Sequence, residues 1–183
     1  MIAHGHLVSE FDVAVEDCPA ASPDHSFVAE GAGSRAAAVV VEPWGEAAWT
    51  ATFASPDPGR RALSALLGTP STTGLCVVER GTVFLGDVLE PEGFDVVLTP
   101  GPVVAAEELA AEAVLLLVTP WAITAVGISG VLWTTPRIAI DGLRVDEASD
   151  GWVGGVADPD DDEPRDFAVE LATGQVVGGA MIA

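Results

Sequence analysis

The side chains that carry most enzymatic chemistry are scarce in this chain. It contains three histidines, His4, His6 and His25, two cysteines, and no lysine or tyrosine. His4 and His6 have the spacing that places two rings on one side of a strand, but no third metal ligand follows nearby. Gly127-Ile128-Ser129-Gly130 lacks the spacing of a nucleophile elbow. We therefore predict no enzymatic activity, no cofactor and no bound metal, and keep a carboxylate-based hydrolase as the enzymatic alternative.

Carboxylates, by contrast, are abundant: 28 acidic residues against seven arginines give a net charge of −21. Such a charge argues against binding to nucleic acid or to an anionic membrane surface, and it favours a cationic partner. A bacterial source with a high-GC genome would explain the absence of lysine, asparagine and tyrosine, and a halophilic source is the alternative. The densest acidic segment, residues 158–163, lacks the ligand spacing of an EF-hand, so a solvated hairpin tip is favoured over a calcium loop.

The predicted partner-binding surface combines the carboxylates of two consecutive hairpins with one tryptophan. Consecutive hairpins usually lie side by side in a sheet, so their carboxylates would form one negative edge. Trp44 follows Pro43 in a turn and is the tryptophan that we expect to be exposed, whereas Trp49 and Trp133 lie in apolar runs and are expected to be buried. The predicted partner-binding residues are Trp44, Asp146, Glu147, Asp150, Asp158, Asp160, Asp161, Asp162 and Glu163.

Short apolar strands separated by tight turns must position these residues. In several of the predicted strand pairs, the two strands are connected through two residues that favour a hairpin turn, such as Arg80 and Gly81. Two segments are ambiguous between helix and strand, residues 60–67 and residues 104–112, and helix propensity favours a short helix in the second. The predicted hairpins are 37–41 with 47–54, 75–79 with 82–88, 143–145 with 152–156, and 167–171 with 175–177.

This pattern predicts an all-β fold of antiparallel sheets with at most one or two short helices. We expect a single domain over residues 1–183, with a weak subdivision near residues 55–59 as an alternative. The sheets would form a β-sandwich or a partial or rolled propeller. Cys76 lies in an apolar run and is predicted to be a free buried thiol, with a disulfide to Cys18 as the alternative.

Several segments, in order along residues 55–180, resemble a set of uncharacterised bacterial β-rich proteins, and the strand–turn–Trp units resemble blades of quinoprotein-type or WD-type propellers. Gly130 and Gly174 end two such units about 44 residues apart, a spacing typical of propeller blades. The resemblance implies β architecture and carries over no activity. A chain of this length is too short for an ordinary closed ring. The resembling segments are 75–78, 131–137, 141–143, 167–174 and 178–179.

The function that these observations favour is a non-enzymatic acidic module that binds a basic protein partner, as a bacterial immunity protein or antitoxin does. The alternative is a structural subunit of a larger β assembly, formed by self-association. The N-terminus lacks the basic and apolar regions of a signal peptide, and the longest apolar run, around residues 113–118, is too short to span a bilayer. We therefore expect a cytoplasmic protein that binds neither membrane nor nucleic acid.

Overall fold

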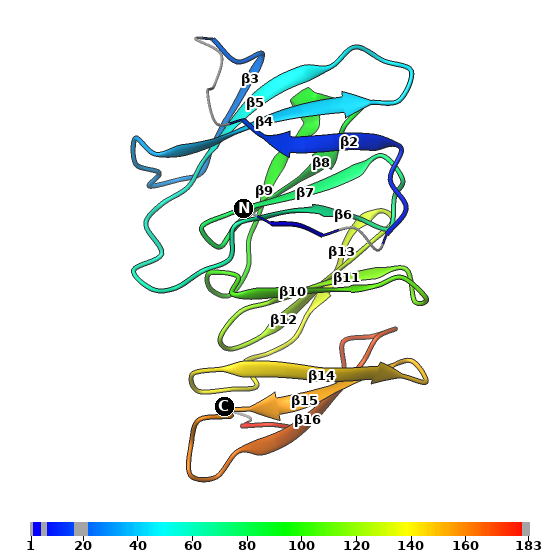
Figure 1. The fold of residues 1–183 in the computed structure, drawn as a ribbon. Coiled ribbons are helices and arrows are strands. Elements are labelled where there is room, and N and C mark those ends of the chain that lie inside the picture. Colours follow the sequence, from blue (N-terminus) through cyan, green and yellow to red (C-terminus); the bar gives the residue numbers. More distant parts are fainter. Residues whose placement is uncertain (1, 5–6, 17–21, 181–183) are drawn as a thin grey trace.

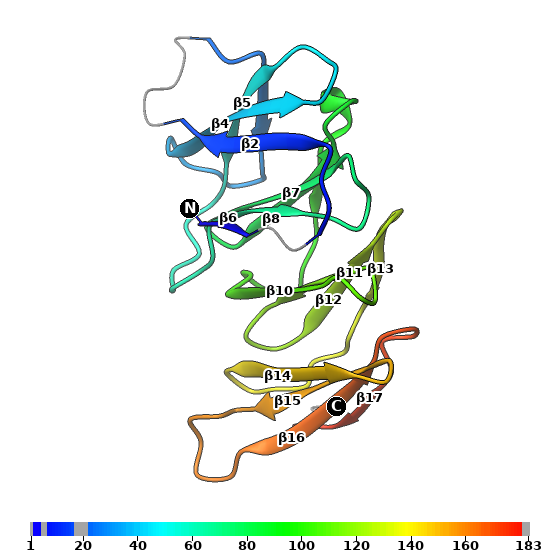
Figure 2. The ribbon, with the colours of Figure 1, turned by 45° about the vertical axis from the view of Figure 1, so that its right-hand side comes forward.

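The computed structural model describes residues 2–4, 7–16 and 22–180, and these residues form four β-sheets stacked in series (Figures 1 and 2). We number the sheets I to IV along the stack. Sheet I has the strand order β2-β4-β5-β3, and sheet II has the order β1-β6-β7-β8-β9. Sheets III and IV are meanders in chain order, β10 to β13 and β14 to β17. The bounds are β1 (Ile2–His4), β2 (Phe11–Val15), β3 (His25–Val28), β4 (Ala36–Pro43), β5 (Trp49–Ala54), β6 (Ala65–Gly68), β7 (Gly74–Glu79), β8 (Thr82–Asp87), β9 (Asp95–Val97), β10 (Ala105–Leu109), β11 (Val114–Val118), β12 (Ile123–Gly127), β13 (Gly130–Thr134), β14 (Leu143–Ser149), β15 (Trp152–Ala157), β16 (Arg165–Glu170) and β17 (Val176–Gly178), with the 3-10 helix η1 (Pro91–Gly93).

The all-β prediction is confirmed. Nearly all strand pairs are antiparallel, and the exceptions are β1 with β6 and β3 with β5, which are parallel. Within the described residues the sheets form an open stack and no closed barrel. The same part of the chain contains no helix of the length and apolarity that a membrane crossing would require.

Three separate apolar cores lie between the four sheets. Phe53 of sheet I and Phe84 of sheet II belong to the first core, and Leu67 of sheet II and Leu117 of sheet III belong to the second. The third core joins sheet III to sheet IV. Sheets II and III are therefore covered on both faces, and every residue of β7 and β11 is buried. Such two-sided burial requires continuous apolar strands, which explains the apolar runs in the sequence.

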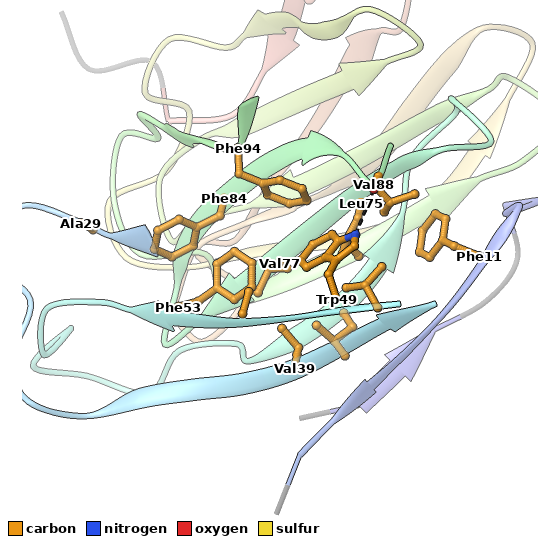
Figure 3. Packing of buried hydrophobic residues seen from close by; sticks show 13 residues of the cluster. Phe11, Ala29, Val39, Trp49, Phe53, Leu75, Val77, Phe84, Val88 and Phe94 are labelled. Carbon is orange, nitrogen blue, oxygen red and sulfur yellow. Dashed lines mark hydrogen bonds between the residues drawn. The ribbon is translucent and has the colours of Figure 1, made fainter. Parts of the chain in front are cut away.

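The core between sheets I and II is aromatic (Figure 3). The ring of Phe53 lies 5.2 Å from that of Phe84 in an edge-on arrangement and 5.0 Å from that of Phe27 in a stacked one. Trp49 is buried as predicted, and its indole N–H donates a 3.0 Å hydrogen bond to the carbonyl of Val88. The same core therefore also fixes the segment that connects β8 to β9, because a buried indole N–H needs an acceptor.

Two of the predicted hairpin turns are confirmed by their backbone angles. Arg80 and Gly81 both have positive φ, 49° and 82°, and so do Asp150 and Gly151, at 51° and 80°. Positive φ at both central residues is what a type I′ turn requires, and its twist matches that of the flanking strands.

Residues 104–112, which the sequence leaves open between helix and strand, form a strand and a turn, and the short helix that propensity favours is not formed. Residues 105–109 form β10, which pairs with β11 along its whole length. The backbone hydrogen bonds that a helix would make internally are made instead to β11, so tertiary pairing overrides the helix propensity of the alanines and glutamates. In the other ambiguous segment, residues 65–68 form β6 and residues 60–64 lead into it without regular structure.

Candidate partner-binding surface

The connections between strands gather on two opposite rims of the stack (Figure 2). Antiparallel strands place successive turns at opposite ends of a sheet, and the four sheets are aligned so that their strand ends form two continuous edges. Backbone hydrogen bonds tie neighbouring turns together along each edge, such as Glu10 N–H to Thr72 O at 2.7 Å on one and Val103 N–H to Gly81 O at 2.9 Å on the other. We call the first edge the acidic rim and the second the arginine rim, and each includes the strand ends that adjoin its turns. The acidic rim contains residues 44–48, 69–73, 88–94, 110–113, 128–129, 150–151 and 171–175. The arginine rim contains residues 29–35, 55–64, 80–81, 98–104, 119–122, 135–142 and 158–164.

Charge is distributed unequally between the two rims. All seven arginines of the chain lie on the arginine rim, either in its loops or at the first two positions of β14 and β16. The turns of the acidic rim contain no arginine in the part of the chain that the structure describes, and their exposed carboxylates have no cationic neighbour on the same rim. The arginines are Arg35, Arg60, Arg61, Arg80, Arg137, Arg144 and Arg165, and the exposed carboxylates of the acidic rim are Glu46, Glu90, Glu92, Glu112 and Asp150.

The acidic segment at residues 158–163 forms the loop between β15 and β16, on the arginine rim. Its last four carboxylates, Asp160, Asp161, Asp162 and Glu163, are exposed. Asp158 differs, because it is buried and accepts hydrogen bonds from the amides of Ile140 and Asp141 at 2.8 and 2.7 Å. This carboxylate therefore holds two loops together.

The predicted negative edge is divided between the rims. The two hairpins are indeed neighbours, but they share β15, so their turns lie at opposite ends of sheet IV. Asp150 lies on the acidic rim, away from the 158–163 loop. Asp146 and Glu147 lie at a bulge in the edge strand β14, where Arg144 Nε donates to Asp146 Oδ1 at 2.7 Å. This hydrogen bond and the charge of Arg144 lower the pKa of the Asp146 carboxyl.

The tryptophans are placed mostly as predicted. Trp44 is 64% exposed in a turn of the acidic rim, and its indole N–H lies 3.4 Å from Asp12 Oδ2. Trp133 is half-buried and donates a 2.8 Å hydrogen bond to the carbonyl of Leu171. Trp121 lies on the arginine rim, with the guanidinium carbons of Arg60 and Arg137 at 5.9 and 5.6 Å from its ring. These arginines are therefore engaged with an aromatic side chain of their own molecule.

Sequence reasoning missed a groove on the acidic rim between sheets III and IV. The groove has a volume of about 650 Å³ and is formed by turns of both sheets. Its lining includes Ile128, Leu132 and Trp152, whose side chains are exposed, and the acidic residues Glu112, Asp150 and Glu170, of which Glu170 Oε2 accepts a 2.6 Å hydrogen bond from Thr173. The sequence feature that could have indicated an exposed apolar site here was Ile128, an apolar residue in the tight turn between β12 and β13. The other lining residues come from turns that are far apart in the sequence, so their proximity becomes visible only in the fold.

A second, more polar hollow of about 330 Å³ adjoins the groove. It lies between sheets II and III and shares Gly127 and Ile128 with the groove. Thr69, Ser71 and Asp87 contribute its polar groups. The two hollows therefore adjoin each other on the acidic rim, with Gly127 and Ile128 lining both.

The buried titratable groups of the described residues lie apart from one another. The buried carboxylates Glu79 and Asp158 belong to sheets II and IV, so they do not face each other across a site. Burial raises the pKa of Glu79, and the nearby Arg80 and Arg35 oppose that effect. Burial also raises the pKa of the free Cys76 thiol to about 12, so the nucleophilic thiolate is disfavoured. No group of three or more potential metal ligands occurs among the described residues. His6 and Cys18 lie outside them.

No protein-family model matches this chain, and no curated protein sequence matches it as a relative. The charge distribution and the groove are therefore the features from which a function can be argued.

Proposed function

We propose that this chain is a non-enzymatic interaction module that binds a basic protein partner through its acidic rim. The observation that carries the proposal is the separation of the seven arginines from the acidic rim. A toxin neutralised in the bacterial cytoplasm, as by an immunity protein, is the kind of partner that the charge suggests. The acidic loop at residues 158–163 supports binding less strongly, because Arg144 and Arg165 lie beside it and Asp158 is occupied with backbone amides.

Uncompensated charge on a rim acts mainly on the rate at which a partner of opposite charge associates. Complementary potentials raise association rates by orders of magnitude at low salt, and screening removes most of the effect at a Debye length of about 8 Å under physiological conditions. The exposed carboxylates of the acidic rim contribute in this way without a nearby arginine to reduce their field. We therefore expect a partner whose association slows steeply as salt is added.

The experiment compares two sets of neutralised carboxylates, three on each rim. A basic partner is captured from the source cells on the immobilised chain, purified, and its association rate is measured by surface plasmon resonance at about 50 and 300 mM salt. Glu90→Gln, Glu112→Gln and Asp150→Asn together should slow association about tenfold at low salt. The matched control is Asp160→Asn, Asp161→Asn and Asp162→Asn, which should change the rate less than about threefold.

Two outcomes would contradict the proposal. If the captured partner carried no excess of positive charge and bound equally fast at both salt concentrations, charge would not be the basis of recognition. If the control variant on the arginine rim lost more than the acidic-rim variant, the partner would bind at the 158–163 loop.

A structural subunit formed by self-association is the second candidate, and the outer face of sheet IV favours it. This face carries small side chains, Gly154 and Ala168, beside Val156 and the exposed Val177. A flat face of this kind could pack against another sheet, as the faces of sheets II and III do inside the stack. Sedimentation velocity distinguishes the candidates: a monomer at about 100 μM argues against an assembly subunit, and a defined oligomer supports one.

A further inference from the structure

We infer that the groove between sheets III and IV is the anchor site for a basic, amphipathic segment of the partner. This inference rests on the proposed function and specifies the chemistry of the partner's contact. The groove combines an apolar lining with acidic residues at its edge. The apolar lining would bind apolar side chains of the segment, and the acidic residues would bind its cationic side chains.

The apolar part of the site comes from side chains that the fold leaves uncovered. Ile128 is 73% exposed, Leu132 is 52% exposed, and Trp152 is 37% exposed, and all three line the groove. Its volume of about 650 Å³ lies within the range of about 300–1,000 Å³ that is typical of ligand sites. Apolar side chains that enter the groove would be removed from water together with these three residues, which favours binding.

The charged part of the site comes from three separate turns. Glu112 lies between β10 and β11, Asp150 lies between β14 and β15, and Glu170 ends β16, and all three line the groove. No arginine contributes to the lining. Lysine and arginine side chains match this combination, because their apolar stems can lie on the groove while their cationic heads remain near the carboxylates. The indole of Trp152 adds a ring face of the kind that attracts cations.

The two adjoining hollows favour a segment over a single small molecule. The polar hollow at Thr69, Ser71 and Asp87 adjoins the groove, and Ile128 lines both. An occupant that follows the rim would thus meet apolar contacts at one end and hydroxyl and carboxylate groups at the other. Extended or helical segments with alternating apolar and basic residues make such contacts in known peptide-binding modes.

The test measures binding of short synthetic peptides to the full chain by fluorescence anisotropy. The first peptide contains leucine and lysine at amphipathic spacing, and the second has each leucine replaced by serine, so the two carry the same charge. We expect the leucine-containing peptide to bind at least about tenfold more tightly. If the serine peptide bound equally well, charge alone would explain binding; the inference would be wrong while the proposed function would stand.

Matched variants locate the site on the protein. Ile128→Ser should weaken binding of the leucine-containing peptide at least about fivefold, whereas Leu98→Ser, an equally exposed apolar residue on the arginine rim, should change it less than about twofold. Both side chains are exposed, so the fold should tolerate the changes, and circular dichroism checks this. Equal effects of the two variants on peptide binding would overturn the inference. It would also be overturned if the unchanged protein formed oligomers and the Ile128→Ser variant did not, because a second copy of the chain would then occupy the groove.

Discussion

At the scale of single residues, Asp158 shows that a carboxylate in an acidic run can have a structural role. Its oxygens accept hydrogen bonds from two backbone amides of the 140–141 segment, and its own backbone has a φ of 52°. Asp158→Ala should destabilise the protein by roughly 2–4 kcal/mol, because it leaves both amides without their charged acceptor. Urea unfolding followed by tryptophan fluorescence measures the loss.

The neighbouring carboxylates provide the control for Asp158. Asp160, Asp161 and Asp162 are exposed, and exposed charges contribute little to stability, so their combined replacement by serine should leave the melting temperature nearly unchanged. If the triple variant were destabilised as strongly as Asp158→Ala, the acidic loop would be stabilised as a unit and Asp158 would have no special role.

Cys76 should dominate the stability of this protein at alkaline pH. Burial raises its pKa from 9.0 to about 12, so the folded state retains a proton that the unfolded chain releases first. This difference in pKa contributes up to about 4 kcal/mol to the free energy of unfolding. The contribution is fully present below pH 9 and is lost as the pH rises toward 12. The chain has no lysine or tyrosine to titrate in this range.

The measurement is the free energy of unfolding in urea between pH 8 and pH 11.5, in a Cys18→Ser background with one remaining thiol. Cys76→Ala should be less stable at pH 8 because it loses buried volume, but its stability should fall less with pH. A decline of equal slope in both proteins would show that Cys76 is not the titrating group.

The individual environments of some residues could be predicted from the sequence. An apolar run around Cys76 and a turn around Trp44 indicated burial in one case and exposure in the other, because both environments are set by near neighbours. Asp158 could not be predicted, because its hydrogen-bond donors belong to residues 140–141 and approach only when sheet IV forms.

At the scale of the elements, two adjacent glycines of β15 have different reasons to lack a side chain. A Cβ on Gly155 would lie 2.0 Å from the carbonyl oxygen of Arg144 and 2.8 Å from the ring of Phe167, whereas one on Gly154 would make only contacts of 3.8 Å or more. Gly155→Ala should therefore destabilise the protein by about 3 kcal/mol through overpacking. Gly154→Ala should change stability by less than about 0.5 kcal/mol.

Chemical denaturation of the two alanine variants tests this difference. Equal stability would mean that β14 and β15 can separate enough to admit a methyl group, and that the third core is less tightly packed than its burial suggests. The comparison needs no further control, since the two changes add the same group to neighbouring positions.

Strand pairs that are joined by a short turn could be recognised from the sequence, whereas pairs between strands far apart in the sequence could not. β7 with β8 and β14 with β15 are hairpins whose turn residues indicate the pairing. β3 instead joins β5 in parallel, with His25 opposite Ala51, and no turn connects the two. β10 was obscured for a different reason, since its residues favour a helix in isolation and become a strand only beside β11.

At the scale of the whole molecule, the unequal rims predict unequal effects of charge reversal. Glu112→Arg places a cation near Asp150 and Glu170, where no arginine is present, and should stabilise the protein by about 0.5 kcal/mol at low salt. Glu163→Arg, the matched change on the other rim, places a cation between Arg165 and the carboxylates of residues 160–162, so its stabilising effect should be smaller.

Thermal unfolding of the two variants at about 20 mM and 1 M salt measures the effect. The difference should disappear at high salt, where the Debye length is about 3 Å. If Glu163→Arg were as stabilising as Glu112→Arg, the field would be uniform over the molecule and the distinction between the rims would have no energetic meaning.

The separation of charge could not be predicted from the sequence, although every arginine is visible in it. The rim on which a loop lies depends on the direction of each preceding strand, so one overlooked strand moves all the following loops to the wrong side. The sequence reasoning also placed the turns of two adjacent hairpins together, whereas a shared strand puts them at opposite ends.

The arrangement of arginines gives this molecule an electric dipole moment as well as a net charge. A uniformly charged particle is attracted to a cationic surface in any orientation, whereas a particle with a dipole is also turned by the field before contact. This chain would therefore approach such a surface with its groove facing forward. The alternation of strand direction thus determines which side of the protein arrives first.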